Sequence, residues 1–226
     1  MFDNFLAEVD VQTTGHLDER TRHIVRVAAV IACDATTVYP AMLTAALESG
    51  QLTATEAGEV VVQAVPYVGM GRVDVFARLT SEVLTARGAQ LPLDPHATVT
   101  TSTAVEAGLQ VQRQIVGRDT VQALYANAPA DEQHIQRWLS AHCFGDHYTR
   151  SGLDVPTREL VTLILLAALG GCDPQVAAHV TGNLNVGNDR AVMIDAVTAV
   201  LPWIGYPRVL NALRAIDQGT TPTDDE

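Results

Sequence analysis

The chain contains no lysine, and all 14 of its lysine-or-arginine positions are arginine. A lysine amine is required for Schiff-base chemistry with carbonyl substrates or pyridoxal phosphate, and the P-loop binds phosphate with one. These mechanisms are therefore excluded for this chain. The chain also has 26 acidic residues, so its formal net charge is −12. Because phosphate groups are neutralised by clustered cations, we expect neither a nucleic-acid partner nor an anionic membrane surface.

Cysteine is also scarce. The three cysteines, Cys33, Cys143 and Cys172, form no close pair in the sequence. This spacing argues against a C-x-x-C redox motif and a cysteine-rich zinc site, and it favours free buried thiols. The chain has no run of eighteen apolar residues, and its first ten residues are acidic where a basic, apolar leader would be needed. We therefore expect a soluble cytoplasmic protein without a bound metal.

What the chain does contain is an internal repeat. The sequence LDERTR at residues 17–22 recurs as LDVPTR at residues 153–158, and PYVG at residues 66–69 recurs as PWIG at residues 202–205. Two one-residue gaps align the two copies. Repeated units bury their apolar faces against neighbouring copies, so the pattern predicts a tandem duplication. With 226 residues and 47% hydrophobic content, the chain can bury a sizeable core.

Both copies have helical patterns. In the second copy, Asp154 is a candidate N-cap and Pro156 lies in the first turn of an almost uniformly apolar helix that ends near residues 170–171. The other helices predicted in this copy span residues 174–186, 191–201 and 208–217. Between the copies, a Pro- and Thr-rich seam precedes two more predicted helices, at residues 104–124 and 131–150.

These patterns predict an all-α fold with four regions. A degenerate first repeat spans residues 1–88, and a linker that contains a helix spans residues 89–130. The second repeat, at residues 131–218, carries the candidate site. Residues 219–226 are predicted to form a disordered acidic tail, whose frayed character begins near Gln218.

The two copies differ at positions that can carry chemistry. His179 in the second copy aligns, within one gap, with Met42 in the first, and Glu159 aligns with His23. Helical spacing places Gln175 in the same row as His179, away from the apolar stripe. Both a solvated polar face and a proton-transferring pocket fit this spacing, and Glu159 also fits the general preference for acids near helix N-termini. Chemistry is expected in the second copy, with the first as scaffold.

The segment at residues 131–150 has no recognisable counterpart in the first copy and concentrates unusual side chains. Arg150 or Arg158 is predicted to supply a planar guanidinium for a substrate carboxylate. Arg158 also fits a structural role, because Arg22 repeats it. Three further side chains are predicted to line a pocket: Trp138, His147 and Tyr148.

Together these residues resemble a known family. The second half is similar to the carboxymuconolactone decarboxylase family, in the alkylhydroperoxidase (AhpD-like) superfamily. The matching positions are FGD at 144–146, Tyr148, Arg150, GL at 152–153, REL at 158–160, His179, Gly187 and the aromatic-x-Gly at 203–205. The resemblance implies an AhpD-like all-helical fold, usually in a homo-oligomer that is a trimer or a hexamer.

The chain departs from the peroxidase pattern of this superfamily. AhpD-type members carry C-x-x-C before the histidine, at the positions that Cys172 and Gln175 occupy here. A dithiol cycle needs one thiolate to attack and a second thiol to close the disulfide, so that cycle is not expected. A single-cysteine peroxidase that uses an external thiol stays open as an alternative.

The resemblance implies a decarboxylase that needs no cofactor. A lactone carboxylic acid loses CO2, its conjugated carbonyl accepts the electrons, and a proton returns to carbon. His179 with Glu159 would supply the proton, Arg150 would hold the carboxylate, and Gln175 would donate to the oxyanion. A related enzyme with different proton-transfer chemistry also fits the sequence, and so does a non-catalytic scaffold.

Overall fold

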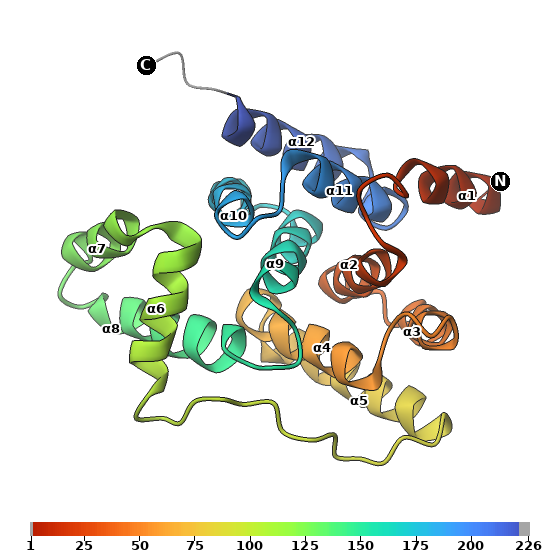
Figure 1. The fold of residues 1–226 in the computed structure, drawn as a ribbon, viewed down its shortest axis with the longest axis horizontal. Coiled ribbons are helices and arrows are strands. Elements are labelled where there is room, and N and C mark those ends of the chain that lie inside the picture. Colours follow the sequence, from red (N-terminus) through yellow and green to blue (C-terminus); the bar gives the residue numbers. More distant parts are fainter. Residues whose placement is uncertain (1, 222–226) are drawn as a thin grey trace.

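The computed structural model describes residues 2–221, and in this range it consists of twelve α-helices and one π-helix without a β-strand (Figure 1). The predicted all-α fold class is confirmed. The first repeat contains α1 (Phe2–Gln12), α2 (Glu19–Ala32), α3 (Tyr39–Glu48), α4 (Ala54–Val68) and α5 (Met70–Ala86). None of the helices described is long and apolar enough to cross a lipid bilayer.

The connection and the second repeat supply the remaining helices. The connection contains α6 (Ala104–Val116) and α7 (Arg118–Asn127). These two helices lie together with α8 (Gln133–Trp138), the first helix of the second repeat, at one side of the molecule in Figure 1. The second repeat contains the π-helix η1 (Leu139–Tyr148), α9 (Val155–Leu169), α10 (Asp173–Asn185), α11 (Arg190–Ile204) and α12 (Tyr206–Thr220).

Helix α9 lies at the centre of the molecule (Figure 1). Its start follows the predicted capping, because the Asp154 carboxylate accepts a hydrogen bond from the backbone N–H of Thr157 at 2.8 Å. All residues from 157 to 168 are buried, and the helix ends at Gly170, whose positive φ of 73° favours glycine. This burial requires neighbours on every side, which both repeats provide.

Several helix contacts join the two repeats, and the most extensive of them is between α2 of the first and α9 of the second. Helix α4 of the first repeat packs against α9 of the second, and α11 of the second packs against α2 of the first. Helix α10 packs against α9 on one side and α6 on another. The space beside α9 and α10 is therefore bounded by the first repeat and the connection as well as by the second repeat.

Two of the predicted helices, one in the connection and one at the start of the second repeat, were wrong in their extent. The segment at residues 104–124 is divided at Gly117, whose φ of 88° ends α6 and begins α7. The segment at residues 131–150 is divided into the α-helix α8 and the π-helix η1, in which each backbone hydrogen bond spans five residues. Helical periodicity alone detects neither change, because the side-chain pattern continues through both.

The C-terminal boundaries also differ from the prediction. Helix α11 continues through Pro202 to Ile204, since a proline in the last turn removes only one backbone hydrogen bond. Helix α12 extends to Thr220, so Gln218 and its next two neighbours are helical and the predicted tail began too early. The rest of that tail, residues 222–226, lies outside the described residues.

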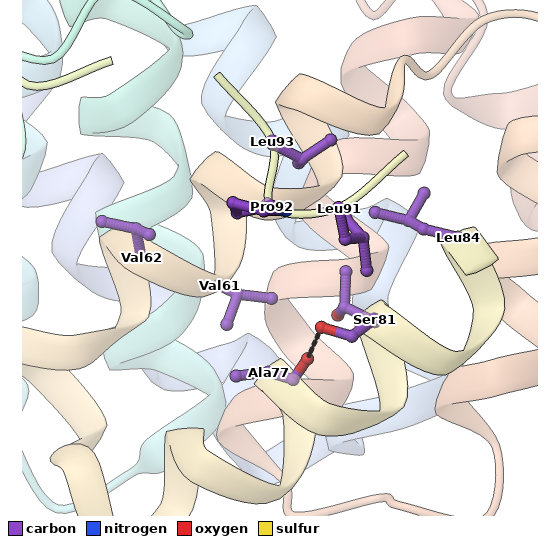
Figure 2. Close-up of a pocket in the computed structure, with 10 residues that line it drawn as sticks. Val61, Val62, Ala77, Ser81, Leu84, Leu91, Pro92 and Leu93 are labelled. Atoms are coloured by element: carbon purple, nitrogen blue, oxygen red, sulfur yellow. Dashed lines mark hydrogen bonds between the residues drawn. The ribbon is translucent and has the colours of Figure 1, made fainter. Parts of the chain in front are cut away.

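An extended segment after α5 crosses the first repeat. Figure 2 shows Leu91, Pro92 and Leu93 of this segment above side chains of α4 and α5, around an apolar cavity of about 470 Å³. Gly58 permits the close approach, since a Cβ there would lie 3.2 Å from a Leu93 methyl group. The side chains described around this cavity include no ionisable group, so its lining is suited to packing and not to acid–base chemistry.

Candidate active site

A second cavity, of about 790 Å³, lies where the connection meets the central helices. Its walls come from α4, α6, α7, η1, α9 and α10. Much of the wall is apolar, including Val116, Leu124, Leu139, Phe144, Leu166 and Leu169. The polar side chains Tyr67, Gln112, Gln175 and His179 also line it. A cavity of this size with a few converging polar groups is typical of small-molecule sites.

His179 and Glu159 meet at the wall of this cavity. The Glu159 side chain on α9 is fully buried, and its Oε1 accepts a short hydrogen bond from Nδ1 of His179 on α10. The His179 side chain keeps 13% of its surface exposed. Because Nδ1 is directed at the carboxylate, the tautomer is set and Nε2 is the nitrogen available to a molecule in the cavity.

The second oxygen of Glu159 is held by two tyrosines in series. The Tyr148 hydroxyl donates to Glu159 Oε2 at 2.6 Å and lies 2.8 Å from the Thr162 hydroxyl, while the Tyr67 hydroxyl donates to Tyr148 at 3.2 Å. Burial, with the nearby Glu159 charge, raises the pKa of both tyrosines well above the usual value. Both hydroxyls therefore stay protonated, and a hydrogen-bonded chain joins the Tyr67 hydroxyl to His179.

Glycine makes room for this pair. A Cβ at Gly182 on α10 would lie 2.4 Å from Glu159 Oε1 and 2.9 Å from an Ile115 methyl carbon. At the adjacent residue, the Asn183 amide donates to the backbone carbonyls of Glu159, at 3.1 Å, and His179, at 2.7 Å. The spacing between α9 and α10 is therefore matched to the carboxylate that lies between them.

Tyr67 is the residue that sequence comparison missed. It belongs to the Pro-aromatic-x-Gly motif that both copies share, which indicated a structural role. The structure shows that Tyr67 lines the cavity, with its ring edge-on to His179 at 5.9 Å between centroids. The first repeat therefore contributes to this cavity and is more than a scaffold. The available signal was the replacement of Tyr67 by Trp203 in the second copy.

The structure places Arg150 away from this cavity. Its guanidinium binds both carboxylate oxygens of Glu59 on α4, at 2.7 to 3.0 Å. The fully buried Arg158 donates to the same carboxylate at 2.6 Å and to Gln63 at 3.0 Å. Burial acts to raise the pKa of Glu59, but the two arginines outweigh burial and hold that pKa below its usual range. This cluster joins the repeats, and its geometry does not support Arg150 as a carboxylate anchor.

The other predicted site residues are divided between the cavity and its surroundings. Gln175 lines the cavity one turn before His179, and Tyr148 lies behind the wall against Glu159. Trp138 is 55% exposed and packs against the His134 ring, outside the cavity lining. His147 is buried beside the backbone carbonyl of His142, also outside the lining, and burial lowers its pKa.

Two of the free cysteines line the cavity. Burial raises the pKa of Cys143 to about 12 and also raises that of Cys172, whose thiol donates to the carbonyl of Leu166 at 3.1 Å. Both are therefore thiols near neutral pH and poor nucleophiles. Within residues 2–221, no three His, Cys, Asp or Glu side chains are grouped closely enough to hold a metal ion.

Comparison with known proteins gives two findings. The model of the "Carboxymuconolactone decarboxylase family" matches two separate regions of this chain, residues 2–82 and 133–218. A protein named 4-carboxymuconolactone decarboxylase, from Acinetobacter baylyi, is 28% identical over 111 residues, which cover 49% of this chain and 82% of that protein. The two matched regions correspond to the tandem repeats of the fold.

Proposed function

The chain belongs to the carboxymuconolactone decarboxylase family, and from this premise we propose that it is a cofactor-independent lyase that uses His179 to transfer a proton at a carbon atom of a small substrate. The observation that carries the proposal is the His179–Glu159 pair at the wall of a 790 Å³ cavity. A scaffold that had lost its chemistry would not need a fully buried carboxylate behind a histidine, since burying such a charge is costly unless it is paired.

Each member of the pair has a distinct role. Glu159 binds Nδ1 and so fixes the orientation of the imidazole ring, while Nε2 gives or takes the proton. Tyr148 positions Glu159 through its second oxygen. Tyr67 and Gln175 line the same cavity and can donate hydrogen bonds to an oxygen that gains negative charge. A positioned acid or base of this kind contributes about 10²- to 10⁴-fold to a reaction rate.

The reaction that the family supports is loss of CO2 from a lactone carboxylic acid. The bond from the substrate carbon to its carboxylate breaks, the electron pair of that bond enters the conjugated carbonyl to form a dienolate, and CO2 leaves. His179 then gives its Nε2 proton to carbon and regains one from solvent. An apolar cavity favours the loss of CO2, because the departing group gives up the negative charge of the carboxylate to the dienolate and leaves as a neutral molecule.

A second reaction, proton transfer without loss of CO2, uses the same residues. It is favoured by the engagement of Arg150 with Glu59, which leaves the cavity without the guanidinium anchor expected from the sequence.

As part of the same proposal, the enzyme is a cytoplasmic homo-oligomer, a trimer or a hexamer as the family resemblance implies. Light scattering on the purified chain tests the oligomer.

The proposal is tested by the variant His179→Ala, with Met42→Ala in the first repeat as the matched control. Carboxymuconolactone and a panel of unsaturated γ-lactone acids and esters are supplied in D2O, and CO2 release and deuterium incorporation at carbon are measured. We expect His179→Ala to lose about 10²- to 10⁴-fold in rate with unchanged helical circular dichroism, and Met42→Ala to keep its rate. Full activity of His179→Ala would remove the proposal.

A further inference from the structure

We propose that the cavity selects a substrate whose body is uncharged and largely apolar, and that it rejects molecules carrying more than one carboxylate. This inference rests on the proposed function because it concerns the same site, but it is a statement about binding and not about proton transfer. It follows from the charges and surfaces that surround the cavity.

The cavity offers mostly apolar surface to a ligand. Leu139, Phe144, Leu166 and Leu169 form much of its wall, from η1 and α9. Its volume of about 790 Å³ lies within the range of about 300 to 1,000 Å³ that is typical of sites for ligands the size of a drug molecule. A fused ring system therefore fits this space, and its burial against these side chains supplies the binding free energy.

The cavity offers no unpaired positive charge to an anion. Among the described residues that line it, His179 is the single basic side chain, and Glu159 binds that side chain directly. A protonated His179 with an ionised Glu159 has no net charge. A ligand carboxylate that enters must lose its hydration shell without gaining a free cation, which is costly.

The fold directs arginines of the surrounding elements away from this cavity. Helix α6 presents Gln112 and Val116 to this cavity, and α7 presents Thr120 and Leu124. Arg113 and Arg118 line a different cavity on another face of the same two helices. The guanidinium of Arg150 is bound to the Glu59 carboxylate, which it shares with Arg158. The absence of a guanidinium at the described wall therefore reflects how the elements are arranged, and not only the number of arginines in the chain.

This binding preference separates the chain from its relative. The name of the Acinetobacter baylyi protein says that it acts on a carboxylated lactone, and the identity between the two is 28%. One departing carboxylate is compatible with the cavity, since the apolar walls favour its loss as neutral CO2. A second carboxylate that stays on the product has no partner there.

The test is a series of three ligands with one ring system: methyl 2-naphthoate, 2-naphthoate and 2,6-naphthalenedicarboxylate. Their dissociation constants for the full chain are measured by isothermal titration calorimetry at neutral pH. We expect the ester to bind most tightly, and each added carboxylate to weaken binding by about tenfold or more, where tenfold corresponds to about 1.4 kcal/mol. Binding of the dianion as tight as that of the ester, or no binding by any of the three, would overturn the inference.

A pair of arginine substitutions makes the test specific to the cavity. Gln175→Arg adds a guanidinium to the wall, and Ala177→Arg adds one to an exposed position of α10 outside the lining. We expect Gln175→Arg to tighten 2-naphthoate binding by about tenfold, and Ala177→Arg to leave it within about twofold. Equal gains in both variants would assign the preference to the overall charge of the chain and contradict a role for the cavity.

Failure of this inference and failure of the proposed function give different results. If the ester binds selectively but no substrate exchanges a proton or releases CO2, the proposed function fails and the binding inference stands. If a substrate with two carboxylates is turned over and bound more tightly than its ester, the binding inference fails and the proposed function stands.

Discussion

The two repeats share a fold, but among the described residues only the second repeat places a histidine bound to a fully buried carboxylate at the wall of the 790 Å³ cavity. In the first repeat, His23 lies 3.7 Å from the exposed Glu19 beside a smaller cavity. Three aligned positions separate them: Glu159, His179 and Gly182 in the second repeat correspond to His23, Met42 and Ala45 in the first. In the second repeat these residues supply a carboxylate, an imidazole and the space between them. In the first, Met42 packs against the core, and burial lowers the pKa of His23. The comparison teaches that this pair requires coordinated changes on two neighbouring helices, while the helices themselves are kept.

A second comparison concerns the ion pairs that hold the repeats together. Glu59 on α4 aligns with Asp195 on α11. Glu59 binds two arginines, one of them fully buried, whereas Asp195 accepts hydrogen bonds from the backbone and ring of His16, whose side chain is 56% exposed. The ion pairs of Glu59 therefore hold the repeats together more strongly than the pair of Asp195 with His16.

The largest expected effect sharpens the first comparison. Glu159→Gln keeps the shape of the side chain but removes the charge that positions His179, so we expect a loss of about 10²- to 10³-fold in proton-transfer rate. His23→Gln, the same substitution at the aligned position, should stay within about twofold of the original rate. Both rates are measured by deuterium incorporation. Similar losses in the two variants would end the distinction between the repeats.

The second effect is on stability. Glu59→Gln leaves the buried Arg158 without its counter-charge, and we expect a loss of about 3 to 5 kcal/mol in the free energy of unfolding by urea. Asp195→Asn, the aligned control, should lose less than about 1 kcal/mol because its partner is largely exposed. A larger loss in the control would contradict the stronger contribution of the Glu59 ion pairs.

The same ion pair predicts a pH dependence. The pKa of Glu59 is lowered in the folded chain, so its contribution to the free energy of unfolding is complete above its unfolded pKa of about 4.3 and is lost as the pH falls through the folded value. Urea unfolding between pH 7 and pH 3 should show this loss in the original chain and a shallower one in Glu59→Gln. Identical slopes would exclude the contribution.

A smaller effect tests the space beside Glu159. Gly182→Ala places a methyl group against the carboxylate, so we expect a rate loss of about tenfold as Glu159 and His179 shift. Ala45→Gly, the reverse change in the first repeat, should leave the rate unchanged and cost about 0.5 to 1 kcal/mol in stability. An unchanged rate in Gly182→Ala would show that the close fit has no role in the reaction.

The smallest expected effect concerns Cys172, one of the two thiols that line the cavity. Because its pKa is raised, Cys172 should remain a thiol near neutral pH, and Cys172→Ser should keep its rate within about twofold. Alkylation of Cys172 by iodoacetamide should be slow at pH 7 and accelerate as the pH rises. A large loss of rate in Cys172→Ser would instead favour a single-cysteine peroxidase.

Local signals in the sequence predicted the framework well. The N-cap at Asp154, the apolar helix after it and the break at Gly170 depend on neighbouring residues, and the structure has all three. The pairing of His179 with Glu159 was also within reach, since the two copies differ at both positions. Contacts between distant segments were not predictable, because no pattern in the sequence relates Arg150 to Glu59 or Tyr67 to Tyr148.

The most direct test of the central claim is a ¹H–¹⁵N spectrum of the histidine ring nitrogens, with and without methyl 2-naphthoate. His179→Gln assigns the His179 signals, and His23→Gln assigns those of the aligned histidine. We expect the ligand to shift the Nε2 signal of His179, while Nδ1 keeps its hydrogen bond to Glu159 and the signals of His23 do not change. A response at His23 with none at His179 would contradict the assignment of the site to this cavity.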